Sequence, residues 1–289
     1  MDIKEIVFNK KKENTYYFDL VDLRDVLKLK PKDHNQFDHH RVSFYVIFLI
    51  IDKQGKHNIN FVDYSYKKGT IFTLRKNNIH KFYKSNANGK LLVFTEDFII
   101  RHSNKTQILK LFQLFNEMLG SSKLQLNTND YIEIESLVYQ IEKEHLSLND
   151  CHSIEIIRSL IQLLILKLFR IKSNENDNFT NKKYYLKLIL FQELVEKDCF
   201  ESKKVSHYAN KMGITTKTLN NITHNVIGKN AKSFIDEIVI LQIKRLLINS
   251  ELSFTEIAYK AGFDVSTNFF KYFRKQTGLS PKEFKENYK

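Results

Sequence analysis

The stretch SFTEIAYKAGFDVSTNFFKYFRKQTGLSPKEF, residues 253–284, decides the fold of the C-terminal part of this chain. It predicts a short helix over Thr255–Ala261 and a second, amphipathic helix over Ser266–Thr277. Between them Gly262 accepts the left-handed backbone of a tight turn, and the small Ala258 lets the two helices cross closely. This pattern indicates a helix-turn-helix unit.

Two helix starts in this stretch carry capping sequences. In Ser253-x-x-Glu256 the serine hydroxyl and the glutamate can satisfy each other's backbone N–H groups. In Ser280-Pro281-x-Glu283 the proline takes the first helical position between the same two kinds of residue. Both sequences predict helices that begin at defined residues.

The same arrangement occurs a second time upstream, at an offset of 49 residues before the turn and 50 residues after it. Two copies are too few for a solenoid, whose repeats cap one another, so a pair of DNA-binding units is favoured over a helical hairpin repeat for protein contact. The matching positions, first copy then second, are Val205 and Phe254, Ala209 and Ala258, Gly213 and Gly262, Leu219 and Phe269, Ile222 and Tyr272, Gly228 and Gly278, and Phe234 and Phe284.

Residues 253–284 closely resemble the C-terminal signature of the AraC/XylS family of bacterial transcription regulators. The resemblance extends over Lys187–Tyr288 and implies two helix-turn-helix units joined by a long helix, here Ala231–Asn249. Nineteen residues form a rod of roughly 28 Å, which suits recognition helices held about one DNA turn apart. The signature positions that match are Ile257, Ala258, Gly262, Phe263, Phe269, Phe273, Gly278, Pro281 and Phe284.

The resemblance also implies which side chains face DNA bases. Asn221 and Lys271 stand where many members have Arg, and Arg is the best bidentate reader of guanine. Asn suits adenine, and the ring of Phe270 would suit a thymine methyl group, so the implied target is rich in A·T pairs. The expected base-contacting residues are Lys217, Asn220, Asn221, Ser266, Thr267 and Lys271.

Charge supports a polyanionic partner. The chain has 46 Lys and Arg against 33 Asp and Glu, a net charge of +13, and residues 180–289 hold 19 of these basic residues against 11 acidic ones. A basic surface alone does not separate nucleic acid from membrane or solubility. The expected phosphate contacts, for which ordinary solvated charge is the alternative, are Lys232, Arg274, Lys275 and Lys282.

The N-terminal part shows short runs of β-branched and aromatic residues separated by turn residues, typical of an antiparallel sandwich or barrel. With Phe37–Phe48 (FDHHRVSFYVIF) and Ile79–Phe82 (IHKF), it resembles the cupin-like sensing and dimerisation half of the same family. The fold class is therefore α+β, with an N-terminal cupin-like β-barrel, a helical dimerisation segment and an all-α double helix-turn-helix domain. The expected strands are Tyr16–Leu20, Arg41–Ile51, His57–Tyr66, Gly69–Leu74 and Lys90–Thr95.

A barrel of this size can hold one small ligand. We expect polar groups at such a pocket, although the same residues could line a filled barrel or its surface. Adjacent His39 and His40 point to opposite faces of a strand, and Val46 stands where a ligand carboxylate would be expected, so neither metal nor cofactor is expected. The candidate effector-pocket residues are His39, His40, Arg41, Tyr45 and His80.

The segment Ser153–Ile171 is apolar on most faces and is our candidate dimer helix, with an ordinary buried helix as the alternative. The expected organisation is a sensing domain at 1–100, a helical dimerisation segment at 101–172, a polar linker at 173–182 and a DNA-binding domain at 183–289. The expected dimer contacts are Ile157, Leu160, Ile161, Leu164 and Leu168.

Together these patterns predict a homodimeric, sequence-specific transcription activator that binds promoter DNA and RNA polymerase and reads a small-molecule effector. The alternative is a cupin-fold enzyme fused to a DNA-binding module. The longest apolar run, Phe44–Ile51, is too short to span a membrane, and Met1–Lys12 lacks the pattern of a signal peptide. We therefore expect a cytoplasmic protein that has no membrane partner and is not an enzyme.

Overall fold

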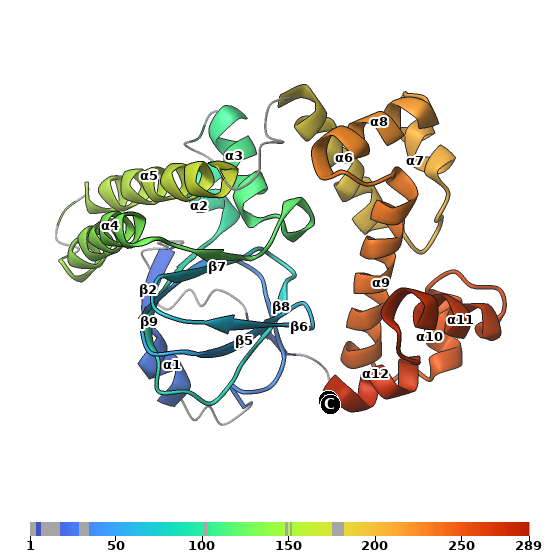
Figure 1. Ribbon diagram of the computed structural model, residues 1–289, viewed down its shortest axis with the longest axis horizontal. Helices are drawn as coiled ribbons and strands as arrows, with labels where there is room; N and C mark the ends of the chain where they lie inside the picture. Colours follow the sequence, from blue (N-terminus) through green and yellow to red (C-terminus); the bar gives the residue numbers. More distant parts are fainter. Residues whose placement is uncertain are drawn as a thin grey trace. The chain divides into compact units, whose positions relative to one another are not determined.

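The computed structural model describes residues 4–6, 18–28, 35–100, 103, 105–147, 150, 152–174 and 182–288 (Figure 1). The chain divides into two compact units, Lys4–Asn176 and Asp177–Lys289. Helices α5 (Ser153–Asn174) and α6 (Lys182–Asp198) extend into both ends of the segment expected as a linker, whose residues 175–181 lie outside the described residues.

The N-terminal unit contains two five-stranded sheets. One sheet has the strand order β1-β3-β8-β5-β6 and the other β10-β7-β4-β9-β2. The closed barrel that the sequence suggested is not found among the described residues, and the cupin-like label stays a prediction. The strands are β1 (Lys4–Ile6), β2 (Phe18–Asp22), β3 (His40–Val42), β4 (Tyr45–Asp52), β5 (Gly55–Ile59), β6 (Val62–Tyr66), β7 (Thr70–Leu74), β8 (Ile79–Phe82), β9 (Asn88–Phe94) and β10 (Lys123–Gln125).

Two of the expected strands are each two strands. The expected strand Arg41–Ile51 breaks at Ser43 and Phe44, so that β3 and β4 lie in different sheets. The expected strand His57–Tyr66 is the hairpin of β5 and β6, with Asn60 and Phe61 at positive φ of 49° and 67° in a two-residue turn. Asn accepts this conformation readily but Phe does not, so the residue types at these two positions did not predict the turn.

Strand β4 lies between two hydrophobic cores, which explains why its sequence is apolar without interruption. Tyr45, Ile47 and Leu49 belong to the core that β4 shares with the helices, whereas Val46 and Phe48 belong to the core between the two sheets. Successive side chains of a strand point to opposite faces, so both faces of this strand are buried.

The helices of the N-terminal unit are α1 (Leu23–Lys28), α2 (Glu96–Ile100), α3 (Lys105–Phe115), the 3₁₀ turn η1 (Glu117–Leu119), α4 (Thr128–Leu146) and α5. Helices α3 and α4 both pack against α5. In α5 the side chains of Ile157, Ile161, Leu164 and Leu168 are 0% exposed and form part of the core under the sheet. The prediction that these four residues form a dimer contact is therefore wrong, because the core of their own unit covers them; Leu160 is half-buried.

The C-terminal unit is all helical. Helix α9 (Ala231–Asn249) contacts each of the other helices of this unit. In Figure 1 it extends from α8 toward α12. Its bounds are those expected from the sequence, and the ring of Phe234 packs against that of Phe191 of α6 in the core. The remaining helices are α7 (Val205–Lys211), α8 (Thr216–Ile227), α10 (Phe254–Lys260), α11 (Ser266–Thr277) and α12 (Pro281–Tyr288).

Candidate DNA-binding interface

Helices α7 and α8 form the first helix-turn-helix. The turn passes through Gly213 at φ 62°, and Ala209 on α7 is 1% exposed where the two helices meet. Thr215 precedes α8, and its side chain accepts a hydrogen bond from the backbone N–H of Thr218 at 3.1 Å. This cap fixes the residue at which the second helix of the unit begins.

Helices α10 and α11 repeat the arrangement, with Gly262 at φ 72°. Here the turn is also held from outside: a Cβ at Gly262 would lie 2.1 Å from the carbonyl oxygen of Phe200, and Lys203 Nζ donates to the carbonyl oxygen of Ala261 at 2.7 Å. Glycine is thus required at this turn both for its conformation and for close approach of the loop before α7.

The predicted capping sequences are confirmed. Ser253 and Glu256 make both reciprocal hydrogen bonds of a capping box at the start of α10. At the start of α12 the backbone N–H of Ser280 donates to the Glu283 carboxylate at 2.7 Å, and the Glu283 N–H donates to the Ser280 hydroxyl at 3.2 Å. The bonds from the backbone and side chain of each serine lower the pKa of both glutamates.

The outer face of α8 exposes Lys217, Asn221 and His224. Asn220, which was expected to contact bases, is used inside the unit. Its Oδ1 accepts from the backbone N–H of Ala231 at 2.9 Å, and its Nδ2 donates to the carbonyl oxygen of Thr216 at 3.1 Å. Asn220 therefore ties α8 to the first turn of α9.

The outer face of α11 exposes Thr267, Lys271, Arg274 and Lys275, whereas Ser266 is half-buried. Phe270 is also half-buried, and its ring packs against those of Phe254 and Phe269 at centroid distances of 6.4 and 5.5 Å. Packing within its own unit therefore uses part of this aromatic side chain, and its contact with a thymine methyl group stays a prediction.

The expected phosphate contacts differ in their surroundings. Arg274, Lys275 and Lys282 are exposed. Lys232 is exposed as well but forms an i,i+4 ion pair with Asp236 on α9. A lysine in such a pair is oriented along its own helix and has to leave its partner in order to reach a phosphate.

In the N-terminal unit three of the five candidate pocket residues lie near one another, namely His39, His40 and His80. His40 pairs with His80 across β3 and β8, and Ile59 pairs with His80 across β8 and β5. Because alternate residues of a strand share a face, His57 on β5 points to the same side as His40 and His80. His39, His40, His57 and His80 are all buried.

Sequence reasoning missed His57, whose ring is 1% exposed and lies 5.4 Å from that of His80, centroid to centroid. Neither ring nitrogen of His57 has a hydrogen-bond partner among the described residues. Burial lowers the pKa of His57 to about 3 and that of His39 to about 4, and holds the pKa of His80 well below its ordinary value. If the pairing of β5 with β8 had been known, the alternation of side chains along β5 would have placed His57 beside His80.

The other two candidates lie elsewhere. Arg41 points away from His40 on β3, is half-buried and forms an ion pair with Glu5 at 3.4 Å. The ring of Tyr45 packs against Phe94 and Phe115 in the core beneath the helices. Arg41 and Tyr45 therefore do not share a pocket with the histidines.

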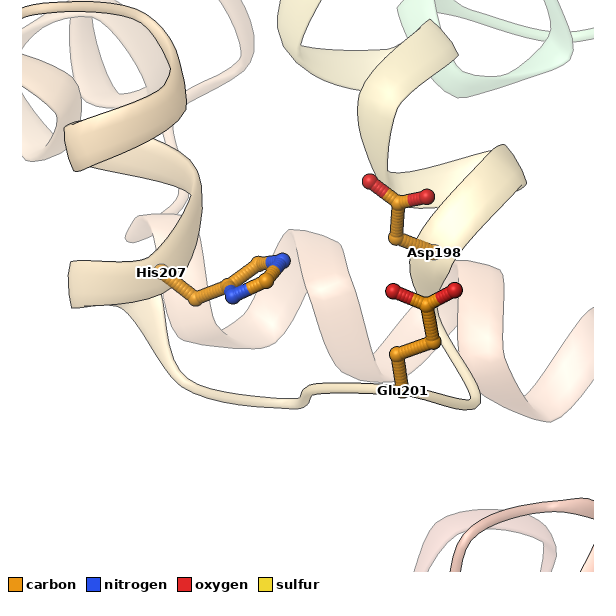
Figure 2. Close-up of side chains that lie close together, drawn as sticks. All are labelled: Asp198, Glu201 and His207. Carbon is orange, nitrogen blue, oxygen red and sulfur yellow. The ribbon is translucent and has the colours of Figure 1, made fainter.

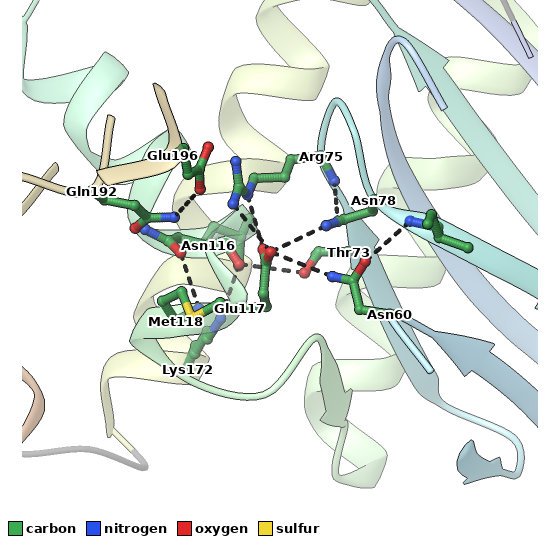
Figure 3. Close-up of polar contacts among 12 residues, drawn as sticks. Asn60, Thr73, Arg75, Asn78, Asn116, Glu117, Met118, Lys172, Gln192 and Glu196 are labelled. Atoms are coloured by element: carbon green, nitrogen blue, oxygen red, sulfur yellow. Dashed lines mark hydrogen bonds and ion pairs between the residues drawn. The ribbon is translucent and has the colours of Figure 1, made fainter. Parts of the chain in front are cut away.

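A polar network at one end of the sheets was also missed. The Glu117 carboxylate accepts from Arg75 Nε at 2.9 Å and from Asn78 Nδ2 at 3.2 Å, as Figure 3 shows. Beneath it, Lys172 Nζ on α5 donates to the carbonyl oxygen of Leu114 at 2.9 Å. These bonds join η1, α3 and α5 to the turn that leads into β8, and isolated polar residues in the sequence gave no sign of them.

A cluster of potential metal ligands lies at the end of α6. Ligand atoms of Asp198, Glu201 and His207 all lie within 4.8 Å of one another, and Figure 2 shows the imidazole facing the two carboxylates. Lys211 Nζ donates to Asp198 Oδ2 at 2.7 Å, and this bond lowers the pKa of Asp198. The sequence analysis expected no metal ligands here.

Known proteins with sequences similar to this chain include transcriptional activators. A family model described as a helix-turn-helix domain matches residues 208–287. The chain is 26% identical over 254 residues to the HTH-type transcriptional activator RhaS of Escherichia coli (strain K12), and equally to RhaS of Shigella flexneri serotype 5b; each match covers 86% of this chain and 88% of the relative.

Solved structures are similar at lower identity. ToxT from Vibrio cholerae in its unsaturated fatty acid-bound form is 16% identical with a TM-score of 0.41, and the match covers 95% of this chain and 96% of that chain. An AraC-type transcriptional regulator from Chromobacterium violaceum is 19% identical with a TM-score of 0.35, covering 37% of this chain and 96% of that chain.

The paired helix-turn-helix units and the sequence matches define a DNA-binding transcription regulator. The matched helix-turn-helix domain and the similarity to RhaS support the resemblance to the AraC/XylS family of bacterial transcription regulators. The chain's relatives are regulators and not enzymes, which sets aside the alternative of a fused cupin enzyme. No helix within the described residues is long and apolar enough to cross a membrane.

Proposed function

We propose that this regulator is a sequence-specific transcription activator that inserts α8 and α11 into successive segments of the major groove of promoter DNA. The observation that carries the proposal is the pair of matching helix-turn-helix units on either side of α9. A 19-residue helix is about 28 Å long, close to the rise of one DNA turn. Activation, rather than repression, follows the printed function of the RhaS relatives and implies contact with RNA polymerase.

Base contacts on α8 would come from Lys217 and Asn221, and those on α11 from Ser266, Thr267 and Lys271. Asn220 supports recognition indirectly, because its amide holds α8 to α9. Arg274, Lys275 and Lys282 would contact phosphates, since they are exposed on or next to α11. Lys232 would join them only after it leaves Asp236.

A homodimer would form through the outer side of the helical layer rather than through the buried face of α5. On α5 Ile156 and Leu163 are 43% and 41% exposed, and with half-buried Leu160 they line a shallow groove. On α4 Ile132 and Tyr139, seven residues apart, are exposed as well. A two-fold contact buries such a self-complementary apolar face.

A small effector would act through the N-terminal unit, where both ring nitrogens of His57 and Nδ1 of His80 are buried without a hydrogen-bond partner among the described residues and offer polar groups to a ligand between the sheets. Neutral imidazoles can donate and accept hydrogen bonds in an apolar site. A regulator that acts on promoters works in the cytoplasm, where bacterial DNA lies.

The test is genome-wide DNA occupancy of the full-length protein, matched with transcript levels. We expect defined promoter sites whose genes lose expression when Lys271→Ala is introduced. In vitro, Lys271→Ala should cost about 1 to 3 kcal/mol at the cognate site and little on random DNA, whereas Lys275→Ala should weaken both alike. Affinity should fall steeply with salt. Equal losses on every sequence, or binding that ignores salt, would contradict the proposal.

A further inference from the structure

A short loop joins the end of α6 at Asp198 to the start of α7 at Val205. Three potential metal ligands lie in this loop or in the helix ends next to it. Asp198 is the last residue of α6, Glu201 lies in the turn that follows, and His207 is the third residue of α7. Their ligand atoms converge to within 4.8 Å of one another. The two carboxylates and the imidazole face a common space in Figure 2.

Two of the three ligand groups are shielded from solvent. The Asp198 side chain is 5% exposed, and Nε2 of His207 is shielded from solvent without a hydrogen-bond partner among the described residues. A buried polar nitrogen without a hydrogen-bond partner is energetically unfavourable. Two carboxylates, those of Asp198 and Glu201, lie beside the imidazole, and the nearby Lys211 and Lys197 offset their charge. The unpartnered ring nitrogen next to two carboxylates is the observation that indicates a cation site.

We propose that Asp198, Glu201 and His207 form a site for a divalent transition-metal ion, with Zn²⁺ as the best chemical match. Zn²⁺ binds imidazole nitrogen and carboxylate oxygen at about 2.0 to 2.2 Å, so two ligand atoms in tetrahedral coordination lie about 3.4 Å apart. Ligand atoms within 4.8 Å need only a small rotation, which the exposed Glu201 can supply. Water completes the coordination. Mg²⁺ and Ca²⁺ prefer all-oxygen sites and fit less well.

Lys211 competes for this site. Its ammonium contacts Oδ2 of Asp198, and its side chain is 41% exposed, so it can turn into solvent when a metal ion arrives. The ion and the ammonium repel each other at short range. Removal of the lysine charge therefore strengthens metal binding, whereas removal of the imidazole weakens it.

The site would act on DNA binding through the loop that it flanks. Phe200 and Lys203 of this loop hold the turn of the second helix-turn-helix at Gly262 and Ala261. A metal ion that joins Asp198 to His207 would fix the loop between α6 and α7, and with it the support of that turn. This consequence rests on the proposed function, whereas metal binding itself does not.

The experiment is calorimetric titration of the metal-free, full-length protein with ZnCl₂, with CoCl₂ as a spectroscopic probe and MgCl₂ as a control. We expect Zn²⁺ to bind at one site that His207→Gln weakens at least tenfold. His152→Gln, which changes an exposed histidine directly before α5, should bind like the wild type. A His207→Gln variant that binds Zn²⁺ as tightly as the wild type would overturn the proposal, because the metal then binds elsewhere.

A second variant tests the competition. Lys211→Gln should bind Zn²⁺ several-fold more tightly than the wild type, with folding checked by circular dichroism. Unchanged or weaker binding in a folded Lys211→Gln protein would contradict the assigned ligands. DNA affinity, measured in EDTA and again with Zn²⁺, should rise with the metal in the wild type and stay constant in His207→Gln. DNA binding in EDTA tests the proposed function separately.

Discussion

The hydroxyl of Tyr272 donates a hydrogen bond to Oδ1 of Asp236 at 2.8 Å and so fastens α11 to α9. Asp236 is itself paired with Lys232 and its side chain is 14% exposed. At the first residue of α9, Asn220 fastens α8 in a similar way through the backbone N–H of Ala231. The long helix thus holds each recognition helix by a specific polar contact in addition to hydrophobic packing.

The first prediction concerns Tyr272→Phe. Loss of its hydroxyl should destabilise the C-terminal unit by about 1 kcal/mol, since one part-buried hydrogen bond is lost. Because α11 is then held less firmly, affinity for a site that engages both recognition helices should fall, as measured by fluorescence anisotropy alongside urea unfolding. Tyr259→Phe, at a 59% exposed position of α10, is the control and should change neither. Reduced DNA affinity with unchanged stability would mean that the Tyr272 hydroxyl contacts DNA.

The second prediction separates two neighbouring asparagines. Asn220→Ala should lower the free energy of unfolding by about 1 kcal/mol, because the first turn of α9 loses a hydrogen-bond acceptor. Asn221→Ala removes an exposed side chain and should leave stability unchanged, while costing about 1 to 3 kcal/mol at the cognate site. Thermal unfolding and DNA titration of both variants measure these effects. A stable Asn220→Ala protein that has lost sequence preference would restore Asn220 as a base reader.

The sequence predicted the C-terminal unit well because its determinants are local. Capping serines, turn glycines such as Gly262 and helical periodicity act within a few residues, and α9 and α11 have the bounds expected from them. The sequence did not reveal the contact of Asn220 with the backbone of Ala231, because Ala231 is eleven residues away and belongs to another helix. Helical periodicity predicts which side chains are exposed, but it does not predict a hydrogen bond to the backbone of another helix.

The N-terminal unit was harder to predict, because its contacts depend on strand register. An uninterrupted apolar run such as β4 does not show which face meets which core. His57 joins His80 only through the pairing of β5 with β8, and Glu117 meets Arg75 across 42 residues. In α5, apolar residues on most faces did not show which face the core would cover.

The third prediction concerns pH. Burial keeps the folded-state pKa of His57 near 3, below the ordinary 6.5, so the folded protein binds fewer protons than the unfolded chain. Stability of the N-terminal unit should therefore be full above pH 6.5 and fall as pH decreases toward 4. At pH 5 the loss from His57 is about 2 kcal/mol, with further losses from His39 and His80.

Hydrogen exchange of peptides that cover β5 and β8, corrected for intrinsic rates, measures this loss between pH 8 and pH 5. His57→Leu should flatten the pH dependence, since the leucine fills an apolar site among Phe48, Phe72 and Phe82. His152→Leu, at an exposed position, should keep it. A His57→Leu protein with the full slope would show that the protons bind elsewhere.

The last prediction concerns assembly and uses two adjacent residues of α5. Leu163 is 41% exposed, whereas Leu164 is 0% exposed in the core beneath the sheet. Leu163→Glu places a charge on the proposed contact and should give a folded monomer that binds half of the DNA site. Leu164→Glu buries an unpaired charge and should prevent folding of the N-terminal unit, at a cost above about 4 kcal/mol. Sedimentation velocity at micromolar concentration and circular dichroism distinguish the two. If the wild type sediments as a monomer without DNA, or Leu163→Glu stays dimeric, the outer side of α5 is not the dimer contact and the surface of α4 around Tyr139 is the next to test.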